Sequence, residues 1–184
     1  MELNAEIERL QRHDFEALST FITRYQRRLF RYLVRMVTDS TVADDLFQQT
    51  WIRVMERIGQ YDQDKSFQSW LFSIAHNLAI DHLRRRQPQS LEEAEFVEPS
   101  IYPDPSALDE LVSLERSEVL ARALSRLPAP YREVLVLKFE EEMKVEEIAD
   151  LLGAPISTVK SRLSRGLERL RKQFEGSYQQ KTKI

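Results

Sequence analysis

The chain has 184 residues, enough for one or two domains with a buried core. Hydrophobic residues make up 42% and charged residues 31% of it, which is typical of a soluble globular protein and excludes a disordered chain. It contains no cysteine, so disulfides and cysteine-bearing zinc sites are excluded and a reducing compartment is favoured. No apolar run reaches the roughly 18 residues of a membrane span, and the charged start lacks an export signal. We therefore expect a cytoplasmic protein without membrane insertion.

Charge is unevenly distributed along the chain, although the net charge is only −3. Residues 1–88 carry 13 basic and 12 acidic side chains, residues 89–114 carry none and 7, and residues 115–184 carry 14 and 11. Within the last part, residues 156–184 carry 8 basic and 2 acidic side chains, a local charge of +6. This distribution indicates separate modules with separate partners.

The first predicted helix runs from Asp14 to about Val37, with Asp14 as its N-cap. Its apolar residues recur in steps of three and four, which predicts one buried stripe. The stripe consists of Phe15, Leu18, Ile22, Tyr25, Leu29, Leu33 and Met36.

A second helix is predicted over residues 41–58, with Asp39 or Ser40 as its cap, and a third over residues 66–86, with Ser66 as its cap. The predicted buried residues are Phe47, Trp51, Met55 and Ile58 in the second helix and Phe67, Leu71, Ile74 and Leu78 in the third.

The segment after the third helix is acidic, contains proline and lacks a helical stripe, so it is interpreted as a tether. Helical patterns then resume and are broken once, by Pro128 and Pro130. No alternating strand pattern of useful length occurs, so the predicted fold class is all-α, with two small helical domains. The predicted divisions are residues 1–88, the flexible acidic linker 89–104, residues 105–175 and the tail 176–184.

A helix-turn-helix pattern occupies residues 145–172. Its short first helix, about 145–152, is predicted to bury Ile148, Ala149 and Leu152. Gly153 permits the positive φ of a tight turn, and Pro155 favours entry into the second helix. The predicted buried stripe of the second helix is Ile156, Val159, Leu163, Leu167, Leu170 and Phe174. Its exposed side carries hydroxyls and cations that suit base edges and phosphates, namely Ser157, Thr158, Lys160, Ser161, Arg162 and Arg165.

Residues 125–166 resemble region 4 of extracytoplasmic-function (ECF) sigma factors, members of the sigma-70 family. The matching residues are Glu147-Ile148-Ala149, Leu152-Gly153 and Thr158-Val159-Lys160-Ser161-Arg162-Leu163. Response regulators share part of this pattern, so the resemblance to ECF sigma factors depends on the first half of the chain. Residues 15–37 resemble region 2.1, residues 43–55 region 2.2, and residues 66–86 regions 2.3 and 2.4. The specific matches in the last segment are Trp70-Leu71, Ile74-Ala75, Asn77, Asp81 and Arg84-Arg85.

The chain departs from the family pattern at two places. Gln49 stands where the family usually has glutamate, which weakens the local negative charge. Glu142 or Met143 stands where the family usually has a glycine before the helix-turn-helix. The expected geometry of this turn therefore differs from that of the family, while the fold is expected to be the same.

The resemblance implies a subunit that gives core RNA polymerase its promoter choice, without catalytic residues, metal or cofactor. It implies that the second helix of the helix-turn-helix reads the −35 duplex through the six exposed residues given above. The residues implied in reading the single-stranded −10 element are Asp64, Lys65, Ser66, Asn77, Asp81, Arg84 and Arg85. Those implied in binding the polymerase clamp helices are Asp44, Asp45, Gln48, Gln49 and Arg53. Phe67 and Trp70, which begin the buried stripe of the third helix, are interpreted as core rather than as base-stacking platforms.

Further partners implied by the resemblance are the polymerase flap and an anti-sigma factor. The acidic linker is either a solubilising tether or, as in the family, a segment that enters the polymerase cleft. His76 and His82 point to different helix faces, so no metal site is expected. Two alternatives remain: a stand-alone helix-turn-helix regulator with a helical partner-binding domain, and a helical interaction module that does not contact DNA.

Overall fold

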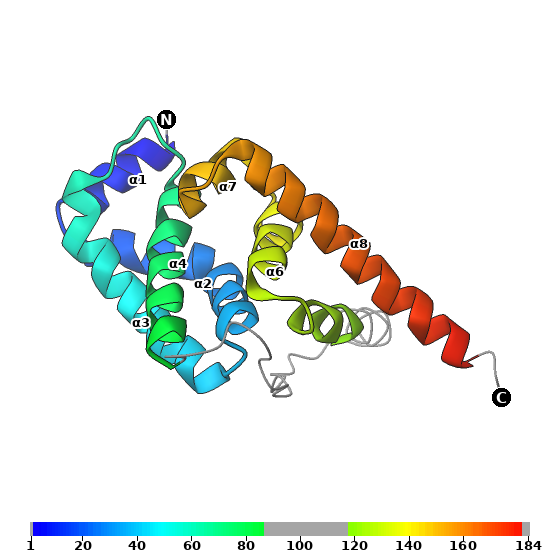
Figure 1. Cartoon of the computed structure of the whole chain (residues 1–184). Coiled ribbons are helices and arrows are strands. Elements are labelled where there is room, and N and C mark those ends of the chain that lie inside the picture. Colours follow the sequence, from blue (N-terminus) through cyan, green and yellow to red (C-terminus); the bar gives the residue numbers. More distant parts are fainter. Residues whose placement is uncertain (1, 87–117, 182–184) are drawn as a thin grey trace.

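The computed structural model describes residues 2–86 and 118–181 (Figure 1). The described residues form helices and connecting turns, without a strand, which confirms the all-α prediction. The predicted linker, residues 89–104, lies outside the described residues. The first part of the chain contains α1 (Glu2–Gln11), α2 (Phe15–Val37), α3 (Ser40–Arg57), the short 3₁₀ turn η1 (Ile58–Gln60) and α4 (Phe67–Arg86). The second part contains helical residues 118–125, α6 (Ala129–Leu135), the π-helical turn η2 (Val136–Glu140), α7 (Val145–Leu152) and α8 (Ile156–Lys181).

Side-chain caps define the starts of three helices. Asp14 accepts hydrogen bonds from the backbone N–H groups that begin α2, and Asp39 does the same for α3. Ser66 Oγ accepts the N–H of Ser69 at 3.3 Å in the first turn of α4. These side chains satisfy amide groups that have no partner within the helix. The caps predicted at Asp14 and Ser66 are confirmed, and Asp39 rather than Ser40 is the cap of α3.

The predicted buried stripe of α2 is correct only toward its C-terminal end. Phe15 is 80% exposed, whereas Phe21 and Tyr32 are fully buried. The early part of α2 is buried instead through Ala17 and Phe21. A helix that the sequence did not predict, α1, packs against α2 and places Ile7 and Leu10 in the core. Of the other predicted positions in this helix, Tyr25, Leu29, Leu33 and Met36 are buried, and Leu18 and Ile22 are partly buried.

The stripes predicted for α3 and α4 are largely correct. Trp51 and Ile58 are buried, and Phe47 and Met55 are partly buried. In α4, Phe67, Leu71 and Ile74 are buried and Leu78 is partly buried. Phe72, a position outside the predicted stripe, is also fully buried, because α4 is covered by α2 and α3 and, in addition, by α7.

The second half shows one further difference. Pro128 stands just before α6 and marks the predicted break. Gly176, in contrast, does not end the last helix, because α8 continues to Lys181. The last helix therefore extends into the predicted tail, residues 176–184. Figure 1 shows α8 running away from the body of the molecule beyond its contact with α6.

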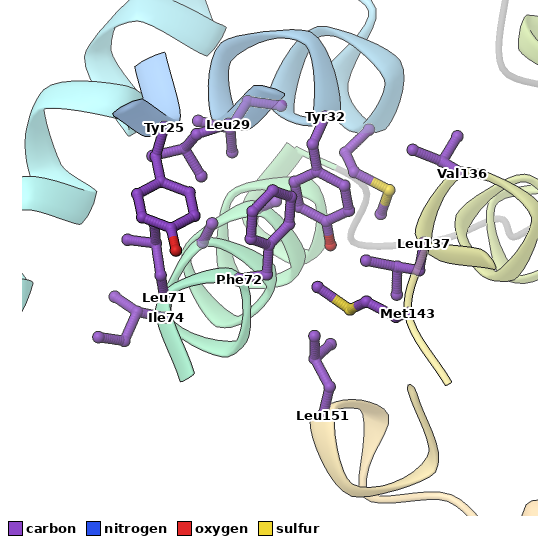
Figure 2. Close-up of a cluster of buried hydrophobic side chains, with 14 of the residues drawn as sticks. Tyr25, Leu29, Tyr32, Leu71, Phe72, Ile74, Val136, Leu137, Met143 and Leu151 are labelled. Atoms are coloured by element: carbon purple, nitrogen blue, oxygen red, sulfur yellow. The ribbon is translucent and has the colours of Figure 1, made fainter. Parts of the chain in front are cut away.

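The two halves of the chain share one hydrophobic core. α6 packs against α2, and α7 packs against α4. Figure 2 shows Tyr32 and Phe72 from the first half beside Leu137, Met143 and Leu151 from the second. The burial of apolar side chains from both halves is the main source of attraction between them.

Candidate nucleic-acid interface

The turn between α7 and α8 has the geometry that its sequence predicts. Gly153 adopts φ 57° and closes α7, its N–H bonding to the carbonyls of Ala149 and Asp150. Pro155 accepts the N–H groups of Thr158 and Val159 at 2.9 and 3.1 Å, so α8 starts directly after it. On α7, Ile148 and Ala149 are buried as predicted, but Leu151 is buried in place of Leu152, which is only partly covered.

The turn before α7 accounts for one departure from the family pattern. Glu142 has φ 57°, in the left-handed region that glycine adopts without strain. The following residues recover regular structure quickly, because the N–H of Lys144 donates to the Glu147 carboxylate at 2.8 Å. The turn therefore forms without the glycine that is usual there, with a strained residue in its place.

The six residues predicted to read duplex DNA lie together on the outer face of α8. Val159, on the opposite side, is fully buried against α7 and the core. Gly166 permits a close approach to α6, since a Cβ there would lie 3.1 Å from Leu135 Cδ1. Ser157, Lys160, Ser161 and Arg165 are exposed, and Thr158 and Arg162 are half-buried. Hydroxyls and cations thus face solvent along the first turns of a helix that α7 supports from behind.

The predicted apolar stripe of α8 is less buried than expected. Val159 alone among its described members is fully covered, whereas Ile156 is 42% and Leu167 is 44% exposed. Leu163, Leu170 and Phe174 are half-buried. The apolar periodicity of α8 therefore overstated its burial among the described residues.

The residues predicted to read the −10 element lie in the loop before α4 and along the exposed side of this helix. Asn77 and Asp81 are exposed on the middle of the helix, and Arg84 and Arg85 are exposed in its last turns. Asp64, Lys65 and Ser66 are exposed in the loop before the helix. At 1.5 Å per residue, Ser66 and Arg84 are about 27 Å apart, so this set is a strip along one helix rather than a cluster.

The loop at residues 61–66 is held in one shape by local bonds. Asp62 accepts the N–H of Lys65 with its carbonyl and that of Asp64 with its carboxylate. The Tyr61 hydroxyl donates to the carbonyl of Lys65, and the Tyr61 ring packs 5.0 Å from that of Trp70. Phe67 is 2% exposed and is a core residue, as predicted, whereas Trp70 is only partly buried.

The residues predicted to bind polymerase share the outer face of α3. All five are exposed: Asp44, Asp45, Gln48, Gln49 and Arg53. Gln48 donates to Asp44 at 3.1 Å, and Arg53 pairs with Glu56 at 2.8 Å. Ile52 lies among them and is 59% exposed, which the sequence analysis missed. An apolar side chain at the centre of a polar face is the usual composition of a protein-binding surface.

A buried polar network between the two halves was also missed. The Glu133 carboxylate accepts from the Tyr32 hydroxyl at 2.7 Å and lies 2.6 Å from His76 Nδ1. Burial, together with the Glu133 charge, holds the pKa of the Tyr32 phenol well above its ordinary value. Burial raises the pKa of Glu141 despite its arginine partners. Residues so distant in sequence give no periodic signal that could have revealed these contacts.

Neither a membrane-spanning helix nor a metal site is found among the described residues. No helix in residues 2–86 or 118–181 is long and apolar enough to cross a membrane. No group of three or more histidine, aspartate or glutamate side chains in this part of the chain is arranged to hold a metal ion.

Comparison with protein families gives two matches. The family model described as Sigma-70 region 2 matches residues 21–89, and the model described as Sigma-70, region 4 matches residues 117–170. The first match covers α3, α4 and most of α2, and the second covers the helix-turn-helix.

Several curated proteins are similar over nearly the whole chain. The ECF RNA polymerase sigma factor SigW of Bacillus subtilis is 32% identical over 186 residues, covering 95% of this chain and 97% of that protein. The RNA polymerase sigma-H factor of Pseudomonas aeruginosa is 33% identical over 182 residues and 92% of each chain. The ECF RNA polymerase sigma-E factor of Escherichia coli is 28% identical over 172 residues and 88% of each chain.

Two solved structures share the fold. CnrH, solved in complex with the cytosolic domain of CnrY, gives a TM-score of 0.69 at 22% identity and covers 94% of this chain and 96% of that one. The sigma factor RpoE of Bartonella quintana, solved with the anti-sigma factor NepR, gives a TM-score of 0.68 at 23% identity and covers 85% and 96%.

Proposed function

Because the chain belongs to the ECF sigma factors of the sigma-70 family, we propose that its exposed helix faces divide promoter recognition and polymerase binding among α8, α4 and α3. The observation that carries this proposal is the arrangement of α7 and α8. Val159 anchors the second helix, and the opposite face presents Ser157, Lys160, Ser161 and Arg165 to solvent. The chain acts as an RNA polymerase sigma factor, and none of its residues is assigned a catalytic role.

The start of α8 reads the −35 duplex. A helix of ordinary diameter fits the major groove of B-DNA, and its first turns approach the base edges. Ser157, Ser161 and Arg165 are four residues apart, so they lie along one line on the exposed side. Arg162 and Lys160 flank this line and contact phosphates, which position the helix without specifying sequence.

α4 and the loop before it read the −10 element. The loop at residues 61–66 offers Asp64, Lys65 and Ser66 to an unstacked base. The edge of such a base can be read by hydrogen bonds once the base has left the duplex. Asn77 and Asp81 face the strand along the helix. Arg84 and Arg85 bind phosphate near its C-terminal end, where a cation is also favoured by the helix dipole.

The outer face of α3 binds core polymerase. The exposed Ile52 supplies apolar contact area at its centre, and the acidic and amide side chains around it supply charge and hydrogen bonds. We assign binding of the polymerase flap to the second domain, residues 105–175. The first domain, residues 1–88, carries both α3 and α4. The acidic linker between them, residues 89–104, is outside the described structure.

Control by an anti-sigma factor is part of the same proposal. RpoE of Bartonella quintana has been solved with an anti-sigma factor, and CnrH with the cytosolic domain of CnrY. Both share this fold, so the chain offers a comparable surface to a comparable partner. The protein acts in the cytoplasm, where polymerase and promoter DNA are found.

The experiment is reconstitution with sigma-free core polymerase and run-off transcription from a promoter library. We expect complex formation and selective initiation. Ile52→Ser should weaken the complex at least tenfold, because it removes the apolar centre of the face. The matched control is Phe15→Ser, which replaces an even more exposed apolar residue on a different helix and should leave core binding unchanged. Absence of a complex at low salt, or tight duplex binding by the chain alone, would overturn the proposal in favour of a stand-alone regulator.

A further inference from the structure

The first helix of the chain lies outside the family match but belongs to the core. α1 spans Glu2–Gln11, whereas the match to Sigma-70 region 2 begins at residue 21. Ile7 is 1% and Leu10 is 0% exposed, and α1 packs against both α2 and the turn η1. Figure 1 shows α1 beside the loop that joins α3 to α4. The burial of these apolar side chains anchors α1 next to the loop assigned to −10 recognition.

Ion pairs at both ends of α1 connect it with α2 and the cap of that helix. Arg9 pairs with Asp14 and with Glu16, each at 2.8 Å, and Glu6 pairs with Arg24 at 2.8 Å. Exposed pairs of this kind add little stability, but they restrict rotation of the helix about its own axis. The last residue of α1 therefore has a fixed place.

Gln11, the last residue of α1, bonds to the loop before α4 at two points. Its Nε2 donates to the carbonyl of Ile58 at 3.2 Å, and its Oε1 accepts from Gln63 Nε2 at 3.3 Å. The Ile58 carbonyl also accepts the N–H of Tyr61 at 3.1 Å, which closes η1. A glutamine amide carries both donors and an acceptor, so this one side chain joins the start of the loop to its middle.

The internal bonds of the loop fix its shape, whereas Gln11 fixes the position of its tip, residues 62–64. In residues 2–86 and 118–181, Asp62 and Asp64 make hydrogen bonds only within the loop, and Gln63 makes one only with Gln11. A surface segment with so few contacts opens easily. Without Gln11, the tip would pivot about the two ends of the loop.

We propose that Gln11 is a positioning residue for −10 recognition, which acts through Gln63 and does not itself touch DNA. This inference rests on the proposed function of the loop. A loop that is already held in its binding position loses less conformational freedom when a base binds, so the affinity is higher. A loop that can shift would also adapt to a poorly fitting base, so the fixed position increases the preference for the correct one.

The first experiment compares Gln11→Ala with the parent, each in complex with core polymerase. The DNA is a labelled single strand carrying the −10 element selected from the promoter library, and fluorescence anisotropy measures its affinity. We expect Gln11→Ala to bind this strand about twofold to tenfold more weakly, the net effect of one hydrogen bond, and to discriminate less against single-base changes. Binding of core polymerase and of the −35 duplex should remain at the parent's values. Gln26→Ala, which removes an exposed glutamine from α2, is the control and should change none of these affinities.

A double substitution separates positioning through Gln63 from support of the Ile58 carbonyl. Gln63→Ala should reproduce the loss, and Gln11→Ala combined with Gln63→Ala should lose no more than either change alone, because both remove the same bond. Additive losses would overturn the proposal. So would an equal loss of −35 binding in Gln11→Ala, or an unchanged affinity and base preference for the −10 strand.

A second measurement needs neither polymerase nor DNA. The N–H groups of Asp64 and Lys65 bond to Asp62 within the loop, and their hydrogen exchange in the free chain should be faster in Gln11→Ala. Exchange in α7 should not change. Unchanged exchange in the loop would contradict the positioning role. If the parent complex failed to bind the −10 strand, the proposed function would fail, and hydrogen exchange would still decide whether Gln11 holds the loop.

Discussion

The Tyr32 hydroxyl and the Glu133 carboxylate meet at 2.7 Å in a buried position, although the two residues stand 101 positions apart in the chain. Each belongs to a different half, and each half matches a different region of the sigma-70 family. This bond therefore connects the part assigned to −10 recognition with the part assigned to −35 recognition. Contacts of this kind fix the position of the helix assigned to −35 recognition relative to the helix assigned to −10 recognition.

Arg162→Ala and Arg165→Ala should each weaken binding of the −35 duplex. A phosphate contact releases counterions, so each substitution should reduce the slope of log affinity against log salt by about one. Fluorescence anisotropy of a labelled duplex over a salt series measures both effects. Arg57→Ala, an exposed arginine on α3, is the control and should leave the slope unchanged. An unchanged slope for both α8 variants would remove the −35 assignment.

Gly166→Leu should destabilise the second half of the chain. A Cβ at this position would lie 3.1 Å from Leu135 Cδ1 and 3.4 Å from the Tyr131 carbonyl, so a larger side chain forces α8 away from α6. Overpacking of this kind costs about 1–3 kcal/mol. Urea unfolding measures it. Gly59→Ala is the control, because nothing lies within 4 Å of a Cβ there, and it should change the free energy of unfolding by less than about 0.5 kcal/mol.

Glu142→Gly should leave the fold intact and stabilise it slightly. The left-handed conformation at φ 57° costs a residue with a side chain about 1–2 kcal/mol. Glycine removes that strain but loses about 0.5–1 kcal/mol through the greater freedom of its unfolded chain. The expected gain is about 0.5–1 kcal/mol in thermal or urea unfolding. Glu142→Ala keeps the strain and should give no gain, so a gain with alanine would contradict this account.

Glu141 should make the stability of the folded protein depend on pH. Burial raises the pKa of its carboxyl above the ordinary value of 4.5, against the opposing influence of Arg28 and Arg31. The folded protein then binds this proton more tightly than the unfolded chain does. Its contribution is therefore most favourable below pH 4.5 and is lost as the pH rises through the raised value.

The comparison of the parent with Glu141→Gln measures this contribution. The difference in free energy of unfolding, parent minus variant, should fall as the pH rises from about 4.5 toward neutral, while the other titrating groups cancel. Urea unfolding at several pH values gives the difference. A difference that rises over this interval would mean that the arginines, and not burial, control this carboxylate.

The sequence by itself determined the local structure and the family. Caps such as Asp14 and Ser66, the turn at Gly153 and the apolar period of α4 act over a few residues, so they can be read without coordinates. The exposed faces of α3 and α8 followed from the same periods. Gly166 stands within a helical pattern in the sequence, but the reason for a glycine there, the close approach of α6, comes only from the tertiary structure.

Only the tertiary structure decided which helix faces are buried and how the two halves of the chain meet. Phe15 is exposed because the buried face of α2 begins with Ala17 and Phe21, and Ile52 is exposed because no described helix covers that side of α3. Nothing in the sequence distinguishes Glu133 and Glu141 from surface carboxylates, since charged side chains are rarely buried without partners. Their partners come from helices about 60 to 110 positions away, and pairing over such distances is set by the packing of whole helices rather than by any local pattern.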